Sequence, residues 1–596
     1  LGKAAVTITT GDITVANGYD GIYVTGTAGL VTVNVNGVVK SGDTIGDHGV
    51  SIGETAATTG GVIGANTKAV FGDPGIFIAD NSATGVKWDA SADVSGSAGG
   101  IVISEANATG PLTVNVSNNA VIDGDDDNDK AGDGIKLDAA GGAILVTSTA
   151  GTTIKGQDGL DLTNTTNGTI TTTIAGSVTG VSGSGIVADT TGTGTVTVSI
   201  TDATSVIKGT STGISIDGSK GDIKVTSVAG SQIIGTSDYG VRAFANSTAA
   251  ITVKTAGTVT SGGTGIYTGS DGLNTVETKS AVSGGANGID ANGGVGGVDI
   301  DVYSSVEGDN NNNGTGHGIN ATVTTSKIDI NLKAGSSIDG NNVNGIYANA
   351  TGDSGIGAQI TIDNDGTIGA VTAVDAIGIQ ATLNTVSKGN IIITGDGSVK
   401  AAGDGVNATN NGTGLVDINY TVDVTSTGAT GIVALNTGAG GDTNVTINAG
   451  SDILALGAAI AATSNGGGDS DVTIVVNGTV KSTAADAIFV KVTGGTGTVD
   501  VGVTTDITTA QAGVNAASTA SGGIKIETAK ISGGTSGILA DGTGGSSTIS
   551  VKVNGDVSAS GQAISATGKN DVGVDVTGKT ITGGSGAAIT ATMDTG

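Results

Sequence analysis

The densest set of potential ligands in the chain is an acidic segment, Asp123-Gly-Asp-Asp-Asp-Asn-Asp-Lys-Ala-Gly-Asp133. Clustered carboxylates are hard oxygen ligands of the kind that Ca²⁺ prefers. The segment is not an EF-hand, because counting from Asp125 puts Lys130 where glycine is required and Lys136 where glutamate is required. Two interpretations stay open, a solvated loop and a calcium site. The candidate calcium ligands are Asp123, Asp125, Asp126, Asp127, Asp129 and Asp133.

Residues suited to acid–base catalysis are few. His48 and His317 are the two histidines, and they lie far apart along the chain. No Ser-His-Asp arrangement can be built around both, and a lone histidine in a loop is most often an ordinary polar residue. The chain has no cysteine, which excludes disulfides and cysteine-based metal sites. The sequence therefore predicts no catalytic residues, no enzyme activity and no cofactor other than the calcium considered above.

The charge balance excludes nucleic acid as a partner. The chain has 24 basic and 54 acidic residues, a net charge of −30, and Arg242 is its single arginine. Binding to nucleic acid needs a basic surface, and arginine is its commonest base reader. The acidity favours instead a surface that stays soluble and repels its own copies. No apolar run in the sequence is long enough to span a membrane as a helix.

The elements that must position these residues follow from a repeat. A small apolar motif, most often Gly-Ile-x-Ala and here called the hook, recurs 22 times between Ile22 and Ile589, which is 567 residues in 21 intervals and a mean period of 27. A period of this size that persists along the whole chain predicts a solenoid. The clearest hooks begin at Gly185, Gly318, Gly345, Gly378, Gly431 and Gly537.

Each repeat divides into three short strands. The hook places Ile and Ala on one face with a variable residue between them, and an alternating run such as 472–476 follows. A very short third strand such as 478–480 comes after a corner that is often Asn-Gly. We expect the Asn-Gly corner to turn the chain, because Asn and Gly accept positive φ at low cost. We expect the hook glycine to turn the chain as well.

The expected fold is all-β: a single right-handed parallel β-helix of about 22 coils of about 27 residues, three short strands to a coil. The composition does not change along the chain, so residues 1–596 are expected to form one continuous solenoid. At roughly 4.8 Å per coil, such a rod would be on the order of 100 Å long. Insertions between hooks, the longest between Ile101 and Ile135 and between Ile346 and Ile379, are the expected places for function.

Aromatic residues, which sugar-binding clefts use as platforms, make up only 2% of the chain. Trp88 is the single tryptophan. Four tyrosines at hook positions would form an outward row if the hooks stack in register: Tyr23, Tyr239, Tyr267 and Tyr347. A groove that combines two carboxylates within about 10 Å of each other and an aromatic neighbour would favour a carbohydrate-active β-helix.

With its Gly-Ile-x-Ala hooks, Val-Asn-Gly-x-Val corners and Gly/Thr/Asn/Ser bias, the chain resembles the passenger domains of bacterial autotransporters and related surface β-helix adhesins. The resemblance covers essentially all 596 residues, rests on repeat style and composition, and transfers no functional residue. It implies a location outside the cell, on the bacterial surface, and a role as adhesin, surface layer or enzyme carrier. The C-terminal membrane domain of that family is not found in the sequence, so we expect this chain to be part of a longer protein.

The functional expectation is a non-enzymatic structural or adhesive β-helix, with a carbohydrate-active β-helix of the lyase or tailspike type as the alternative. Neither end of the sequence reads as a cap, and an open coil exposes strand edges that invite association. Expected partners are therefore other copies, end to end as a filament or side by side as a surface layer, and a neighbouring cell surface or its polysaccharide.

Overall fold

The computed structural model describes residues 4–16, 18–42, 46–54, 57–105, 109–126, 131–311, 314, 316–352, 359–369, 374, 376–384, 388–544 and 547–594. These residues form 66 β-strands and no helix. Contacts divide the chain into two compact units, Leu1–Ala291 and Asn292–Gly596. The division falls within β33 (Ile289–Gly293), the thirty-third strand, so each unit holds eleven coils of three strands.

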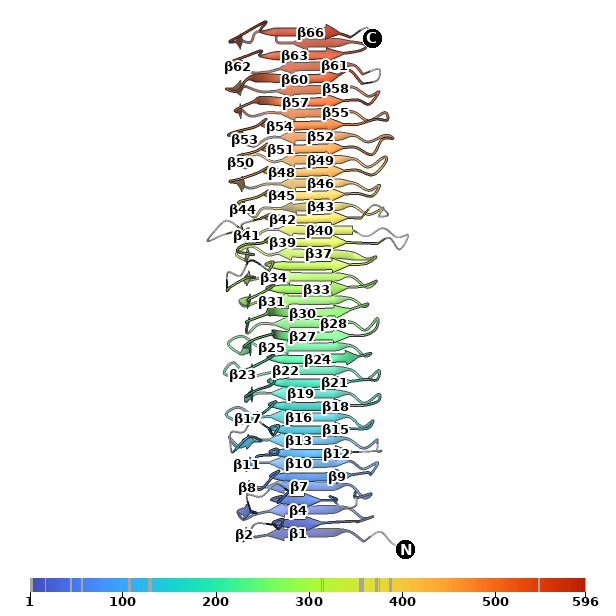
Figure 1. Cartoon of the computed structure of the whole chain (residues 1–596), viewed down its shortest axis with the longest axis vertical. Coiled ribbons are helices and arrows are strands. Elements are labelled where there is room, and N and C mark those ends of the chain that lie inside the picture. The colour runs from blue at the N-terminus through green and yellow to red at the C-terminus, as the bar shows by residue number, and fades with distance from the viewer. Residues whose placement is uncertain are drawn as a thin grey trace. The chain divides into compact units, whose positions relative to one another are not determined.

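Each coil contributes one strand to each of three parallel sheets. In the first coil these are β1 (Val6–Thr10), β2 (Ile13–Thr14) and β3 (Ile22–Val24), and the same order recurs in unit 2 with β34 (Val298–Val302), β35 (Ser305–Glu307) and β36 (Ile319–Val323). Within each unit every strand pairs with its equivalent in the next coil, as Figure 1 shows. The predicted fold class, a right-handed parallel β-solenoid with three strands per coil, is confirmed.

All 22 predicted hooks lie in strands of the third sheet. These strands are β3, β6 (Val50–Ile52), β9 (Ile76–Asp80), β12 (Ile101–Glu105), β15 (Ile135–Ala139), β18 (Leu160–Asn164), β21 (Ile186–Thr190), β24 (Ile214–Ser219), β27 (Tyr239–Ala245), β30 (Thr264–Ser270), β33, β36, β39 (Ile346–Ala350), β42 (Ile379–Leu383), β45 (Val406–Asn410), β48 (Ile432–Asn436), β51 (Ile460–Ser464), β54 (Ile488–Val492), β57 (Ala512–Ser518), β60 (Ser536–Gly542), β63 (Ile564–Gly568) and β66 (Ile589–Met593).

The hooks stack in register. In unit 2, Ile319 pairs with Ile346 and Ile346 with Ile379, while the hook alanines pair in the same way two residues later. These isoleucines are fully buried. Because side chains alternate along a strand, the residue between Ile and Ala points outward at every hook. The third sheet therefore carries one inner apolar column and one outer variable column.

The first sheet supplies the widest apolar layer of the core. Its five-residue strand β52 (Val472–Val476) is typical: residues 472, 474 and 476 are buried and the two between them are half-buried. The second sheet is shorter and places a single large side chain inward, such as Val480 in β53 (Thr479–Ser482). Alternation of this kind is what a strand with one buried face requires.

Five of the six clearest hook glycines stand at bends directly before a strand, as expected, and the sixth, Gly537, lies within β60. None of the six clearest hook glycines has a positive φ. A Cβ on Gly345 would instead lie 2.4 Å from Cγ2 of Ile368 and 2.7 Å from the carbonyl oxygen of Gly378. The corner glycines behave alike, since a Cβ on Gly478 would meet the carbonyl oxygen of Ser451 at 2.3 Å. Glycine is needed here because coils stack too closely for any side chain.

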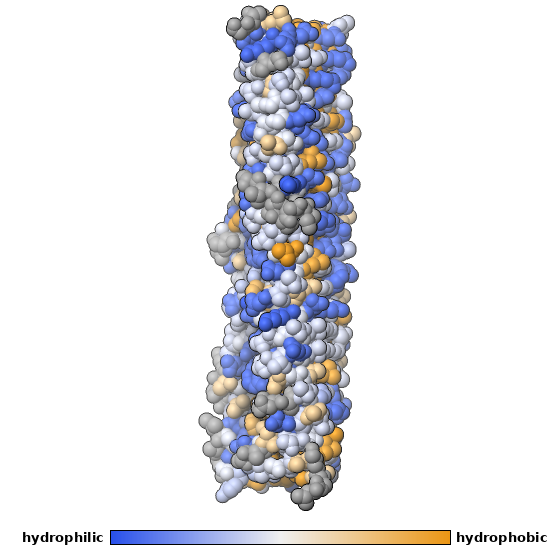
Figure 2. Space-filling view, turned by 90° about the vertical axis from the view of Figure 1, so that its right-hand side faces the viewer, coloured by the Kyte–Doolittle hydropathy of each residue, from blue (hydrophilic) through white to orange (hydrophobic). Residues whose placement is uncertain are grey.

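Polar side chains inside the solenoid satisfy turns. Asn436 donates from Nδ2 to the carbonyl oxygen of Gly414 at 2.6 Å and accepts the amide of Gly438 at Oδ1. The single tryptophan, Trp88 in β10 (Val86–Ala90), is also inside, and its Nε1 donates to Asn66 Oδ1 at 3.0 Å. Trp88 therefore serves the core and offers no platform to a sugar. The face drawn in Figure 2 is mostly polar, with small scattered apolar patches.

Candidate functional site

The acidic segment begins at the end of β14 (Val121–Asp123) and leads into β15. Asp123 ends β14, and its Oδ1 accepts the amide of Asp125 at 3.1 Å. Asp125 is buried and Asp126 is exposed. Asp127 and Asp129 lie outside the described residues. The segment therefore leaves the second sheet and returns to the third within one coil of unit 1.

The two ends of this segment face different lysines. Asp123 Oδ2 lies 3.4 Å from Nζ of Lys155 in β17 (Thr153–Gly156), whereas Asp133 Oδ2 lies 3.7 Å from Nζ of Lys136. Asp133 Oδ1 accepts the amide of Asp158 at 3.1 Å. Within the described ranges, no three of the six aspartates bring ligand atoms within 4.8 Å of one another. Calcium binding by this segment stays a prediction.

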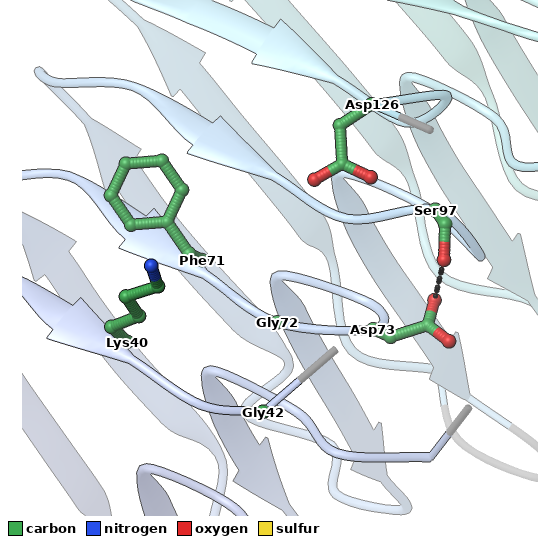
Figure 3. A pocket seen from close by; sticks show the side chains of 7 residues that line it. All are labelled: Lys40, Gly42, Phe71, Gly72, Asp73, Ser97 and Asp126. Atoms are coloured by element: carbon green, nitrogen blue, oxygen red, sulfur yellow. Dashed lines mark hydrogen bonds between the residues drawn. The ribbon is translucent and has the colours of Figure 1, made fainter. Parts of the chain in front are cut away.

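Asp126 does line a pocket of about 390 Å³, drawn in Figure 3. Lys40, from the end of β5 (Val39–Lys40), and Phe71, from the end of β8 (Val70–Phe71), lie on one side of it. Asp73 and Ser97 lie on the other side. Because β5 and β8 are neighbouring strands of the second sheet, Lys40 and Phe71 pair in register and lie one above the other.

The pocket contains a carboxylate that is only half satisfied. Asp73 is 4% exposed, and its Oδ1 accepts hydrogen bonds from Ser97 Oγ, at 2.9 Å, and from the amide of Ala98. Its Oδ2 is buried and has no hydrogen-bond partner among the described residues. A buried carboxylate oxygen without a partner costs free energy. With Asp126, Lys40 and Phe71, the pocket combines both charge signs and one aromatic ring.

A second charged feature covers the outer face of the third sheet in the neighbouring coils. Lys136 Nζ donates to Asp161 Oδ2 and also faces Asp133. Burial raises the pKa of Asp133 to about 6, and it raises the pKa of Asp138 and of Asp158 as well. Lys136 is a single positive charge beside these three carboxylates, so it cannot neutralise all of them. Part of this surface therefore carries protons in mildly acidic solution.

The carboxylate row continues over β21 and β24. Burial raises the pKa of Asp189 to about 6, although its Oδ1 accepts the amide of Asp217 at 3.1 Å. Asp217 Oδ2 in turn lies 3.0 Å from Nη1 of Arg242. The guanidinium of Arg242 packs 6.0 Å from the ring centre of Tyr239 and 5.7 Å from that of Phe244. The guanidinium of Arg242 thus contacts the carboxylate row on one side and the two aromatic rings of Tyr239 and Phe244 on the other.

The four predicted tyrosines do not form one row. Tyr239 and Tyr267 have ring centres 5.6 Å apart, so two of them meet. Tyr347 stacks on His317 instead, with ring centres 5.1 Å apart and planes 16° apart. Tyr23 is 46% exposed on β3, a strand at the start of unit 1. Burial lowers the pKa of His317, so this ring is neutral at pH 7.

One cluster was not predicted from the sequence. Asp20, His48 and Glu54 bring one ligand atom each within 4.8 Å of one another. His48 and His317 lie far apart in the sequence, and this separation alone does not reveal that His48 has an acidic neighbour one coil away, Asp20. The repeat contains the signal: Asp20 and His48 each stand two residues before a hook residue, Ile22 and Val50, and equivalent positions of successive coils must lie together.

The chain matches no family model, no curated protein and no solved structure at a significant level. Among the described residues, no helix is long and apolar enough to cross a membrane.

Proposed function

We propose that this chain is a non-enzymatic structural or adhesive β-helix that works outside the cell, on a bacterial surface. The observation that carries the proposal is the in-register hook column, which in unit 2 links Ile319 coil by coil to Ile564 through paired, buried hook residues. A column of this kind makes the stacked coils stiff, and this role needs no catalytic side chain. The resemblance to autotransporter passengers and surface adhesins supplies the proposed location.

Surface chemistry supports the same proposal. A net charge of −30 keeps separate copies soluble until a partner or an ion screens them. Outward positions vary from coil to coil while inward positions stay apolar, so binding surfaces can change without loss of the core. We propose other copies, a neighbouring cell surface and its polysaccharide as partners.

Electron microscopy of negatively stained, purified chain tests the structural role. We expect stiff particles of uniform width, single or joined end to end. Ile432→Asp places a charge in the buried hook column and should disrupt them, because Ile432 is fully buried. Val433→Asp is the matched control, since Val433 is the outward residue of the same hook. Flexible wild-type particles, or equal damage by both variants, would contradict a role as a stiff scaffold.

A second candidate function is a carbohydrate-active β-helix, and the pocket in Figure 3 favours it. Asp73, Asp126 and Phe71 are the residue types that this alternative requires, two carboxylates and an aromatic neighbour. The test is the release of new chain ends from a panel of bacterial polysaccharides. Asp571 is the control, because it is exposed and lies in unit 2, away from the residues that line this pocket. Activity that Asp73→Asn and Asp126→Asn abolish, and that Asp571→Asn leaves intact, would establish this function in place of the structural one.

A further inference from the structure

The cluster of Asp20, His48 and Glu54 joins the first two coils of unit 1. Asp20 stands before β3, whereas His48 and Glu54 flank β6 in the next coil. His48 Nδ1 lies 3.0 Å from Asp20 Oδ1 and 3.7 Å from Glu54 Oε2. In the part of the chain that the structure describes, this is the one place where three metal-ligating side chains converge.

The neighbouring structure holds all three side chains in place. The main-chain amide of His48 donates to Asp20 Oδ1 at 2.8 Å, and Ser51 Oγ donates to Glu54 Oε2 at 3.2 Å. Phe77, on the next coil, packs against the imidazole with ring centres 5.1 Å apart. His48 is 5% exposed, and the side chains of Asp20 and Glu54 are 10% and 39% exposed. Ligands supported in this way are oriented before a metal binds.

Two carboxylate oxygens face one imidazole nitrogen, an arrangement that a positive centre between them would complete. A proton on Nδ1 can satisfy Asp20 at 3.0 Å, but Glu54 at 3.7 Å is beyond hydrogen-bond distance. A metal ion at about 2.0–2.2 Å from each ligand atom needs those atoms roughly 3.0–3.7 Å apart. Both distances from Nδ1 lie in this range. Two carboxylates also match the charge of a divalent cation in a largely buried place.

We propose that Asp20, His48 and Glu54 bind a divalent transition-metal ion such as Zn²⁺. The imidazole ligand favours a transition metal over Ca²⁺ or Mg²⁺, which prefer oxygen. Binding takes the Nδ1 lone pair of the neutral imidazole, whose single proton then resides on Nε2. Three protein ligands leave a position for water or for a group from another molecule. The ion ties the first coil to the second and is independent of both the calcium prediction and the proposed function.

The full-length chain is titrated with Zn²⁺ by calorimetry after removal of bound metal, and Co²⁺ absorption reports the coordination. We expect one Zn²⁺ per chain, a rise in Tm on binding, and a loss of affinity of at least about tenfold in His48→Gln and Glu54→Gln. His317→Gln is the matched control, because it removes the other histidine. Ca²⁺ serves as the second probe and should bind without dependence on His48.

Glu54→Gln keeps the test decisive if His48→Gln does not fold, because the Glu54 side chain is 39% exposed and its loss leaves the core intact. Its Tm without metal should equal that of the wild type, while the Tm shift caused by Zn²⁺ is lost. Zn²⁺ binding that is equal in the wild type, His48→Gln and Glu54→Gln would show ordinary carboxylate binding and overturn the proposal. Failure to detect saturable binding to the wild type would overturn it too.

Discussion

At the scale of single residues, Glu105 is the one buried carboxyl group of the described residues whose two oxygens both lack a hydrogen-bond partner. It ends β12 and pairs in register with Asp80 at the end of β9. The two side chains are 2% and 1% exposed. Asp80 accepts hydrogen bonds from Thr58 Oγ1 at 2.5 Å and Ser82 Oγ at 2.6 Å, whereas neither carboxyl oxygen of Glu105 has a partner among the described residues. Burial raises the pKa of Glu105 to about 7, and the charge of Asp80 adds to the rise.

Glu105 should therefore make the protein less stable as the pH rises. Its folded-state pKa lies above the ordinary value of 4.5, so the folded state binds more protons between pH 4.5 and about 7. The free energy of unfolding falls through that window. We expect Glu105→Gln to stabilise the protein at pH 8 by on the order of 1–3 kcal/mol and to have little effect at pH 4.5. Urea unfolding followed by circular dichroism at both pH values measures the difference.

Glu277 gives a control of opposite sign. It lies on β31 (Asn274–Thr278), and hydrogen bonds from Lys254 Nζ and Lys279 Nζ lower its pKa. The stabilisation that ionised Glu277 gives the folded protein is present above the ordinary pKa of 4.5 and is lost as the pH falls below it. Glu277→Gln should therefore lower the free energy of unfolding at pH 8. If both substitutions moved stability in the same direction at pH 8, the electrostatic account of Glu105 would be wrong.

The sequence alone identified candidate residues better than it predicted which side chains would lie in contact. It singled out the acidic segment, yet the structure shows that Asp123 and Asp133 face separate lysines. It treated His48 as a lone side chain, although Asp20 occupies the same repeat position one coil earlier. Such meetings depend on which outward position of one coil stacks over which position of the next, and a loop of variable length hides that alignment until the hooks are superposed.

At the scale of the strand and its turn, the hook glycine Gly345 stands at a bend where the next coil comes too close for any side chain. A Cβ on Gly345 has no room against Ile368 and the backbone at Gly378. We expect Gly345→Ala to destabilise unit 2 by about 1–3 kcal/mol, because an added methyl group forces neighbouring coils apart. Urea midpoints followed by circular dichroism measure the effect.

Gly502 in β55 (Val499–Val503) is the matched control for that substitution. It lies in the same unit, has no positive φ, and a Cβ there would have its nearest neighbour at 4.0 Å. Gly502→Ala should be neutral or slightly stabilising, since alanine reduces the entropy of the unfolded chain. Equal midpoints for the two variants would contradict the steric account of the hook.

The positions of the hook strands could be predicted from the sequence, but the steric reason for glycine at the hooks and corners could not. Apolar alternation placed every hook in a strand, because burial on one face fixes the period of a strand. Glycine is associated with turns, and that association suggested a positive φ at the corner glycine Gly478, which the structure does not show. The real constraint is the approach of one backbone to another, which involves Gly378 or Ser451 one coil away. Trp88 was likewise considered for a surface role because nothing nearby in the sequence reveals that Gly64, opposite its ring, leaves room for it inside.

At the scale of the whole molecule, charge should govern association. The net charge of −30 repels neighbouring copies, and salt shortens that repulsion from about 10 Å at 0.1 M to about 3 Å at 1 M. We expect a single species in low salt at pH 7 and larger species in 1 M NaCl, measured by sedimentation velocity. The same association should occur without salt near the sequence isoelectric point of about 4.1. A sedimentation coefficient that stays constant under both changes would contradict self-association.

The in-register ladders also affect how such a gene can change. Each coil presents the same three strand edges to the coil before it and to the coil after it, as the hook residues of unit 2 show where Val406 pairs with Ile432 and Ile432 pairs with Ile460. Recombination that removes the DNA between two equivalent hook codons rejoins edges that already match. The repeat can therefore shorten or lengthen over generations by whole coils, while point substitutions on the outward positions diversify what each coil displays.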